Sequence, residues 1–156
     1  MPALRRYAWA LLRNRDDADE LVQDCLVRAL GRLPTPSSDL AVRPWLFTIL
    51  HNLSVSRWRT LRRRGRSVDA ATIDLPIPPP QEWSLAARDM MQGLRDLPDE
   101  QRQVLLLVGV EGLEYREAAA VLGLPIGTVM SRLSRGRDAL RARMEGRERP
   151  ALRRVK

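Results

Sequence analysis

Apolar side chains recur at helical spacing in three consecutive stretches of the first sixty or so positions. Over residues 2–13 they repeat every three or four positions, which predicts a short amphipathic helix. The segment Asn14-Arg15-Asp16-Asp17 breaks this helix and supplies N-caps for a second, with Glu20 in a capping-box position after Asp17. The second helix runs to about Leu30, and Gly31 ends it. Beyond a proline-containing loop, a longer third helix is predicted from Pro44 to Arg64.

The second half of the chain repeats this pattern after a segment without periodicity. Residues 65–82 end in a proline-rich run, which predicts a semi-rigid linker between two domains. Helices are predicted over residues 83–94 and 99–110, and a helix pair over residues 115–140 turns at Gly123. The apolar stripe of the last helix comprises Ile126, Val129, Leu133, Leu140 and Met144. The predicted fold is all-α, with helical domains over residues 1–64 and 83–145 and a basic tail over 146–156.

The charge balance favours a polyanionic partner. The 156 residues include 27 Lys and Arg against 19 Asp and Glu, a formal net charge of +8. Nucleic acid is the first candidate for that partner and an anionic membrane the second. No apolar run approaches the roughly 20 residues that span a bilayer, so no membrane insertion is expected. A single cysteine excludes an internal disulfide, which favours the reducing cytoplasm.

The sequence contains no recognisable catalytic or metal-binding set. His51 and Cys25 are the only histidine and the only cysteine, too far apart for a nitrogen and sulfur metal cage. We find no glycine-rich phosphate loop, no Ser/His/Asp set and no carboxylate pair, so we expect no enzyme activity, cofactor or small-molecule substrate. Cys25 lies on an apolar stripe and is interpreted as core, and His51 as a polar contact.

The helix after Pro125 has a polar side opposite its apolar stripe, formed by Thr128, Ser131, Arg132 and Arg135. Hydroxyls and guanidiniums in this arrangement suit the DNA major groove. An ordinary surface hairpin with a solvated charged face fits the same pattern equally well. The rest of the chain must therefore decide between the two.

Two charged faces in the first domain indicate further binding surfaces. The second helix exposes an acidic face, of which Gln23 and Asp24 lie beyond the turn that the helix dipole explains, which favours protein binding. The third helix carries polar and aromatic residues among many arginines, as in single-stranded nucleic-acid surfaces. These residues are Trp45, Asn52, Ser56, Arg57, Trp58, Arg59, Arg62, Arg63 and Arg64.

Two blocks of the sequence resemble one protein family. The segment from Leu97 to Leu140 is similar to region 4 of extracytoplasmic-function (ECF) sigma factors. The matching positions are Leu97-Pro98, Glu111-Gly112-Leu113, Tyr115, Leu122-Gly123, Pro125, Gly127-Thr128-Val129 and Ser131-Arg132-Leu133. The segments DADELVQDCLVRAL and RPWLFTILHNL resemble region 2 of the same family. The two blocks stand in the expected order across the linker and together cover residues 4–143.

This resemblance implies an alternative sigma factor that binds core RNA polymerase, through its β′ clamp coiled coil and β flap, and directs it to promoters. It implies polymerase contacts from Asp19, Gln23, Asp24 and Arg28. At the −10 element it implies a base-cradling loop over residues 34–42, with contacts from Asn52, Ser56, Arg57 and Arg59. At the −35 element it implies base contacts from Thr128, Ser131, Ser134 and Arg135, with Arg132, Arg137 and Arg141 near phosphates. An anti-sigma partner that holds the two domains together is also expected.

The sequence departs from the family pattern at two places. Position 130 is commonly lysine or arginine in this family, but here it is Met130, at the margin of the apolar stripe. We expect Met130 to pack inward and contribute no charge. The first helix of region 2 normally has more chain before it, which makes Met1 a candidate late start or truncation. The alternative function is a stand-alone helix-turn-helix regulator, which explains the second block but not the first.

Overall fold

The computed structural model describes residues 2–33, 41–65 and 84–148, with side chains as far as residue 146. The first helical unit comprises α1 (Pro2–Leu12), α2 (Arg15–Leu30) and α3 (Val42–Arg63). The second comprises α4 (Leu85–Arg95), α5 (Asp99–Val104), η1 (Leu105–Val110), α6 (Tyr115–Leu122) and α7 (Ile126–Glu148). These residues contain no strand, which confirms the all-α class. The predicted linker after Gly65, most of the −10 loop and the end of the basic tail lie outside the described residues.

The start of α2 differs from the prediction. The side-chain oxygen of Asn14 accepts hydrogen bonds from the N–H groups of Asp16, at 2.9 Å, and Asp17, at 3.2 Å. Asn14 is therefore the N-cap, and the capping box predicted between Asp17 and Glu20 is wrong. Both of those carboxylates lie inside the helix and bind Arg57 of α3 instead.

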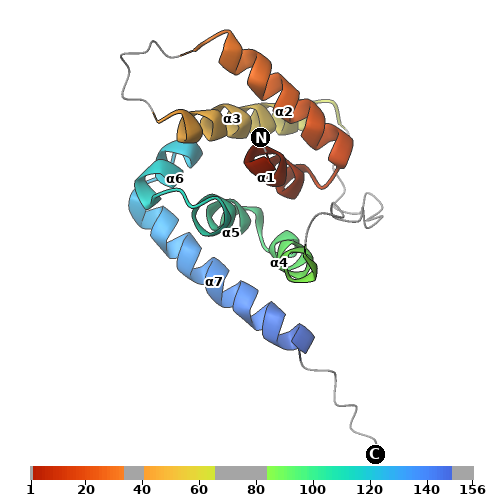
Figure 1. Ribbon diagram of the computed structural model, residues 1–156, viewed down its shortest axis with the longest axis vertical. Coiled ribbons are helices and arrows are strands. Elements are labelled where there is room, and N and C mark those ends of the chain that lie inside the picture. The colour runs from red at the N-terminus through yellow and green to blue at the C-terminus, as the bar shows by residue number, and fades with distance from the viewer. Residues whose placement is uncertain (1, 34–40, 66–83, 149–156) are drawn as a thin grey trace, which may run out of the picture.

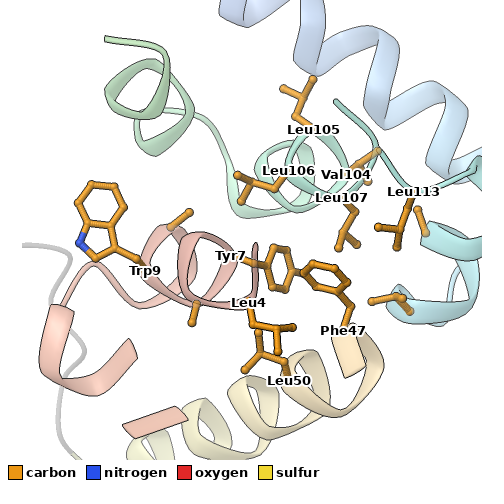
Figure 2. Packing of buried hydrophobic residues seen from close by; sticks show 14 of the residues in the cluster. Leu4, Tyr7, Trp9, Phe47, Leu50, Val104, Leu105, Leu106, Leu107 and Leu113 are labelled. Carbon is orange, nitrogen blue, oxygen red and sulfur yellow. The ribbon is translucent and has the colours of Figure 1, made fainter. Parts of the chain in front are cut away.

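The two helical units pack against each other over a shared apolar core (Figure 1). Tyr7 of α1 and Phe47 of α3 are buried, and their rings meet edge to face with centroids 5.5 Å apart. Figure 2 shows Leu107 and Leu113 of the second unit facing these two rings. The predicted domains are thus in direct contact, and α3 also packs against α6. The domain boundaries remain a prediction.

The predicted helix over residues 99–110 does form, but its second half is the π-helix η1. The N–H of Glu111 donates to the carbonyl of Leu106 at 2.8 Å, and Leu113 donates to Leu107 at 2.9 Å. Such wide turns are rare and are often found at functional positions. Here the wide turn places Glu111 at the junction of the two units, with its side chain fully buried.

Candidate nucleic-acid and polymerase interfaces

The α6–α7 pair is held by one left-handed turn and by close packing against η1. Gly123 has φ 64° and ψ 37°, a conformation that glycine adopts without a Cβ clash. The carbonyl of Pro125 accepts the N–H of Thr128 at 3.0 Å, which starts α7. Farther along α7, a Cβ added to Gly136 would lie 2.9 Å from Cδ1 of Leu105, so only glycine fits without a shift of its neighbours. These contacts confirm the predicted helix pair.

The apolar stripe of α7 is narrower than predicted. Val129 and Leu133 are buried, while Leu140 and Met144 are partly buried. Ile126 is exposed, so its assignment to the buried stripe is wrong. Three residues before Val129, Ile126 lies about 60° around the helix from it and falls at the edge of the stripe.

The polar side of α7 gathers most of the predicted −35 residues. Ser131, Ser134, Arg135 and Arg137 are exposed, and Thr128 is partly exposed. The hydroxyl of Ser131 donates to the carbonyl of Thr128 at 3.1 Å, and Nε of Arg135 donates to the carbonyl of Ser131 at 3.4 Å. Arg132 stands apart on the flank, 3.5 Å from the carboxylate of Glu100 on α5.

Met130 does not pack inward as predicted. Half of its surface is exposed, and it lies on the same side of α7 as Ile126. Met130 lies about 100° around the helix from Val129 and about 60° from Leu133, at the rim of the apolar stripe rather than at its centre, so half of its surface stays exposed. A large apolar side chain is therefore presented to solvent beside the polar side of α7.

The predicted −10 residues on α3 fall into two groups. Asn52, Ser56 and Arg59 are exposed, and near them the guanidinium of Arg62 stacks on the ring of Trp58 at 4.4 Å. Arg57 instead lies 2.9 Å from the carboxylate of Asp17 and 2.6 Å from that of Glu20 on α2. These contacts pin α3 to α2 and occupy the guanidinium of Arg57.

The predicted polymerase-binding residues lie along α2. Gln23, Asp24 and Arg28 are exposed, whereas Asp19 is paired with Arg5 of α1 at 2.8 Å. The exposed face continues toward the end of α2 with side chains that the sequence reasoning missed. Val27 and Leu30 are each 70% exposed, and Leu33 and Val42 are also exposed. The sequence could have indicated Val27 as part of this exposed face, because it follows Gln23 by four positions and Asp24 by three, which is helical spacing.

The junction of the two units contains a buried ion cluster that the sequence did not reveal. The carboxylate of Glu111 accepts two hydrogen bonds from Arg6, one from Nε at 3.0 Å and one from Nη2 at 2.9 Å. It accepts a third from Nη2 of Arg43 at 3.3 Å. Across the same junction, the guanidinium of Arg95 on α4 lies 3.6 Å from the ring of Trp9. Arg13 donates to the carbonyl of Arg95 at 2.8 Å.

Burial also shifts the pKa values of several groups in the first helical unit. It raises the pKa of Tyr7 well above its usual range, so the phenol keeps its proton, and it raises the pKa of the Cys25 thiol to about 11. Burial lowers the pKa of His51, whose Nδ1 is 3.2 Å from the Tyr7 hydroxyl. His51 is therefore the polar contact that the sequence predicted.

Two further findings concern the described part of the chain as a whole. It contains no group of three His, Cys, Asp or Glu residues placed to hold a metal ion. None of its helices is long and apolar enough to cross a membrane.

Comparisons with known proteins decide the family. Residues 87–140 match the family described as Sigma-70, region 4, and residues 1–51 match the Sigma2 domain of PhyR. The ECF RNA polymerase sigma factor EcfG of Rhodopseudomonas palustris is 41% identical, over 91% of this chain and 79% of that protein. The ECF sigma factor SigC of Mycobacterium tuberculosis is 35% identical, over 87% of this chain and 75% of that protein. This chain belongs to the ECF RNA polymerase sigma factors.

A solved structure agrees with this assignment of an ECF sigma factor. The sigma factor RpoE of Bartonella quintana, in complex with the anti-sigma factor NepR, aligns with a TM-score of 0.78 and 37% identity. The alignment covers 92% of this chain and 91% of that chain. Sigma factors are not an enzyme family. The match over residues 1–51 also favours a sigma factor over a stand-alone helix-turn-helix regulator, because such a regulator needs no sigma region 2.

Proposed function

We propose that this chain is an alternative sigma factor that carries core RNA polymerase to promoters through paired contacts at the −10 and −35 elements. The observation that carries the proposal is the presence, on one chain, of a polar reading face on α7, a basic face on α3 and an acidic face on α2. A DNA-binding module alone would use the first of these faces and has no need of the third.

At the −35 element, α7 lies in the major groove. Ser131, Ser134 and Arg135 face base edges, with Thr128 beside them, and Arg137 lies nearer the phosphate backbone. Arg132 reaches a phosphate only if it leaves Glu100, whose carboxylate is mostly exposed and holds it weakly. Each good bidentate contact with a base is worth about 1–3 kcal/mol of discrimination.

At the −10 element, α3 supports strand opening. Separating stacked base pairs costs about 1–2 kcal/mol per step, so melting needs compensating contacts with the opened strand. Asn52, Ser56 and Arg59 are exposed together on α3 and offer hydrogen bonds and positive charge. Arg57 contributes to phosphate binding only after release from Asp17 and Glu20, so we assign it mainly to holding α3 against α2.

Polymerase binds the exposed face of α2. Gln23, Asp24 and Arg28 supply the polar contacts with the β′ clamp coiled coil, and Asp19 joins them or keeps its pairing with Arg5. The neighbouring exposed side chains of Val27 and Leu30 supply apolar area, which a charged face alone lacks. The second unit adds a contact with the β flap.

An anti-sigma factor controls the protein in the cytoplasm, where polymerase and chromosome are found. Support comes from two relatives of known structure, RpoE with the anti-sigma factor NepR and CnrH with the cytosolic domain of CnrY. The second aligns with a TM-score of 0.66 and 30% identity, over 93% of this chain and 82% of that chain. A partner that favours the packed arrangement of the two units keeps them from spanning both promoter elements.

Transcription with purified core polymerase tests the proposal. Core enzyme plus this chain is incubated with a genomic fragment library, and transcript start sites are mapped. We expect starts at positions that share two upstream motifs, and none with core enzyme alone. If the chain binds promoter duplex tightly but never associates with core enzyme in a pull-down, it is a stand-alone regulator and the proposal fails.

A further inference from the structure

A groove beside the polar face of α7 contains groups that the proposed −35 contacts do not use. It measures about 260 Å³ and lies between the start of α6 and the middle of α7. Its apolar lining comes from Tyr115, Met130 and Leu133. Its donors are Ser134, Arg137 and Arg141, and Asp138 is its one carboxylate.

Met130 is the unusual member of this lining. It is 50% exposed, and Tyr115 beside it is 37% exposed, although both lie within a surface of hydroxyls and guanidiniums. Apolar side chains grouped in a hollow of a polar surface indicate a surface that a partner covers. The surrounding donors carry two guanidiniums against one carboxylate, which favours an anionic partner.

We propose that Met130 is a specificity residue that contacts the 5-methyl group of a thymine in the −35 element. In the major groove the thymine methyl is the apolar feature of the base edges, and an apolar side chain distinguishes it from cytosine, which lacks it. Ser134 lines the groove and is one of the residues proposed to face bases, and it lies about 40° around α7 from Met130 and about 60° from Ser131, so a duplex that covers Ser131 and Ser134 also passes Met130. Arg141 then lies toward a phosphate one turn farther along α7. The inference rests on the proposed −35 role of α7.

Deoxyuridine substitution tests this inference, because deoxyuridine pairs like thymidine but lacks the methyl group. Holoenzyme assembled from the full chain and core polymerase selects −35 sequences from a randomised promoter library. Each thymine of the selected element, on both strands, is then replaced in turn by deoxyuridine, and binding is measured. We expect one position at which the replacement lowers affinity about four-fold, the effect of losing one buried methyl group.

Two variants complete the experiment. Met130→Ala lowers affinity for the thymine duplex by a similar factor and removes the sensitivity to deoxyuridine at that position. Met90→Ala, a change at another exposed methionine on α4, keeps the sensitivity. Circular dichroism spectra of both variants that match the unmodified chain exclude a folding defect.

The inference is overturned by any of three outcomes. The selected element contains no thymine, deoxyuridine is neutral at every position, or Met130→Ala remains as sensitive to deoxyuridine as the unmodified chain. If deoxyuridine has no effect at any position and Met130→Ala binds an anti-sigma factor more weakly, the groove is a binding site for that protein and not for DNA. In all these cases the holoenzyme still selects promoters, so the proposed function stands. Its own failure would appear as no selection at all.

Discussion

Arg6 and Glu111 are 105 positions apart in sequence, yet two hydrogen bonds of 3.0 and 2.9 Å join their side chains. The guanidinium and carboxylate are arranged in the bidentate geometry that makes such pairs strong. Glu111 is fully buried at the end of η1, so its charge depends on Arg6 and on the more distant Arg43. This pair joins the first helical unit to the second.

Removal of Arg6 should destabilise the packed arrangement. Arg6→Ala leaves the buried carboxylate with Arg43 alone, and we expect a loss of about 1–3 kcal/mol in the free energy of unfolding. Urea denaturation measures the change. Arg5→Ala is the matched control, because Arg5 is its neighbour and forms a largely exposed pair with Asp19, worth about 1 kcal/mol or less. Equal losses for the two variants would contradict a special role for the buried pair.

Arg135 should contribute to −35 recognition without affecting polymerase binding. Arg135→Ala removes a guanidinium from the polar face of α7, and we expect promoter affinity to fall by about 1–3 kcal/mol. Binding is compared on duplexes with intact and scrambled −35 elements, since the scrambled duplex should be bound almost equally by both proteins. A parallel loss of core-polymerase binding would indicate misfolding rather than lost readout.

Charge reversal on α2 should weaken the association with polymerase. Asp24 is exposed beside Gln23, and Asp24→Arg replaces an attractive charge with a repulsive one at the proposed contact with the β′ clamp. We expect an affinity loss of about 10-fold or more, with a larger effect at low salt. Glu145→Arg, at an exposed position near the far end of α7, makes the same charge change as a control. An unchanged affinity for Asp24→Arg would remove this face from the interface.

His51 should make stability depend on pH in mildly acidic solution. Burial lowers its pKa in the folded state below the ordinary value of 6.5, so the unfolded chain binds the proton more tightly. The stabilisation is fully present above pH 6.5 and is lost as the pH falls through that value toward the folded-state pKa. The slope is at most about 1.4 kcal/mol per pH unit.

Denaturation curves between pH 5.5 and 7.5 measure this dependence. Tyr7, whose hydroxyl is 3.2 Å from Nδ1 of His51, does not change charge in this range because burial raises its pKa well above the usual value. His51→Gln keeps a hydrogen-bonding side chain without a titration, so its stability should be flat over the same range. A slope that persists in the variant would assign the effect to other groups.

Cys25 should be unreactive in the folded protein. Its side chain is buried, its Sγ lies 3.5 Å from the carbonyl of Leu46, and burial raises its pKa to about 11. The thiolate is the reacting species, so modification by a disulfide reagent at pH 8 should be at least about 100-fold slower than in urea. Rapid stoichiometric modification under native conditions would contradict the packing of α2 against α3.

The helices and the faces they present could be predicted from the sequence, because both depend on short-range spacing. Apolar residues three or four positions apart define each stripe, and Gly123 specifies its own turn. The positions of the three proposed interfaces followed from the complementary polar residues on the same helices. The resemblance of the two sequence segments to regions 2 and 4 of ECF sigma factors agreed with the comparisons with known proteins.

Tertiary packing decided what spacing left open. Asp17 and Glu20 were expected to cap α2, but the approach of α3 brings Arg57 to them. Met130 stands at the edge of a stripe, and only the position of α5, η1 and α6 against α7 determines that it remains exposed. Glu111 could not be assigned a partner, because a buried charge is paired by whichever cation the docking of the two units brings near it. The helices and their polar faces follow from local periodicity. The contacts between helices join residues far apart in the chain, so they depend on the folded arrangement.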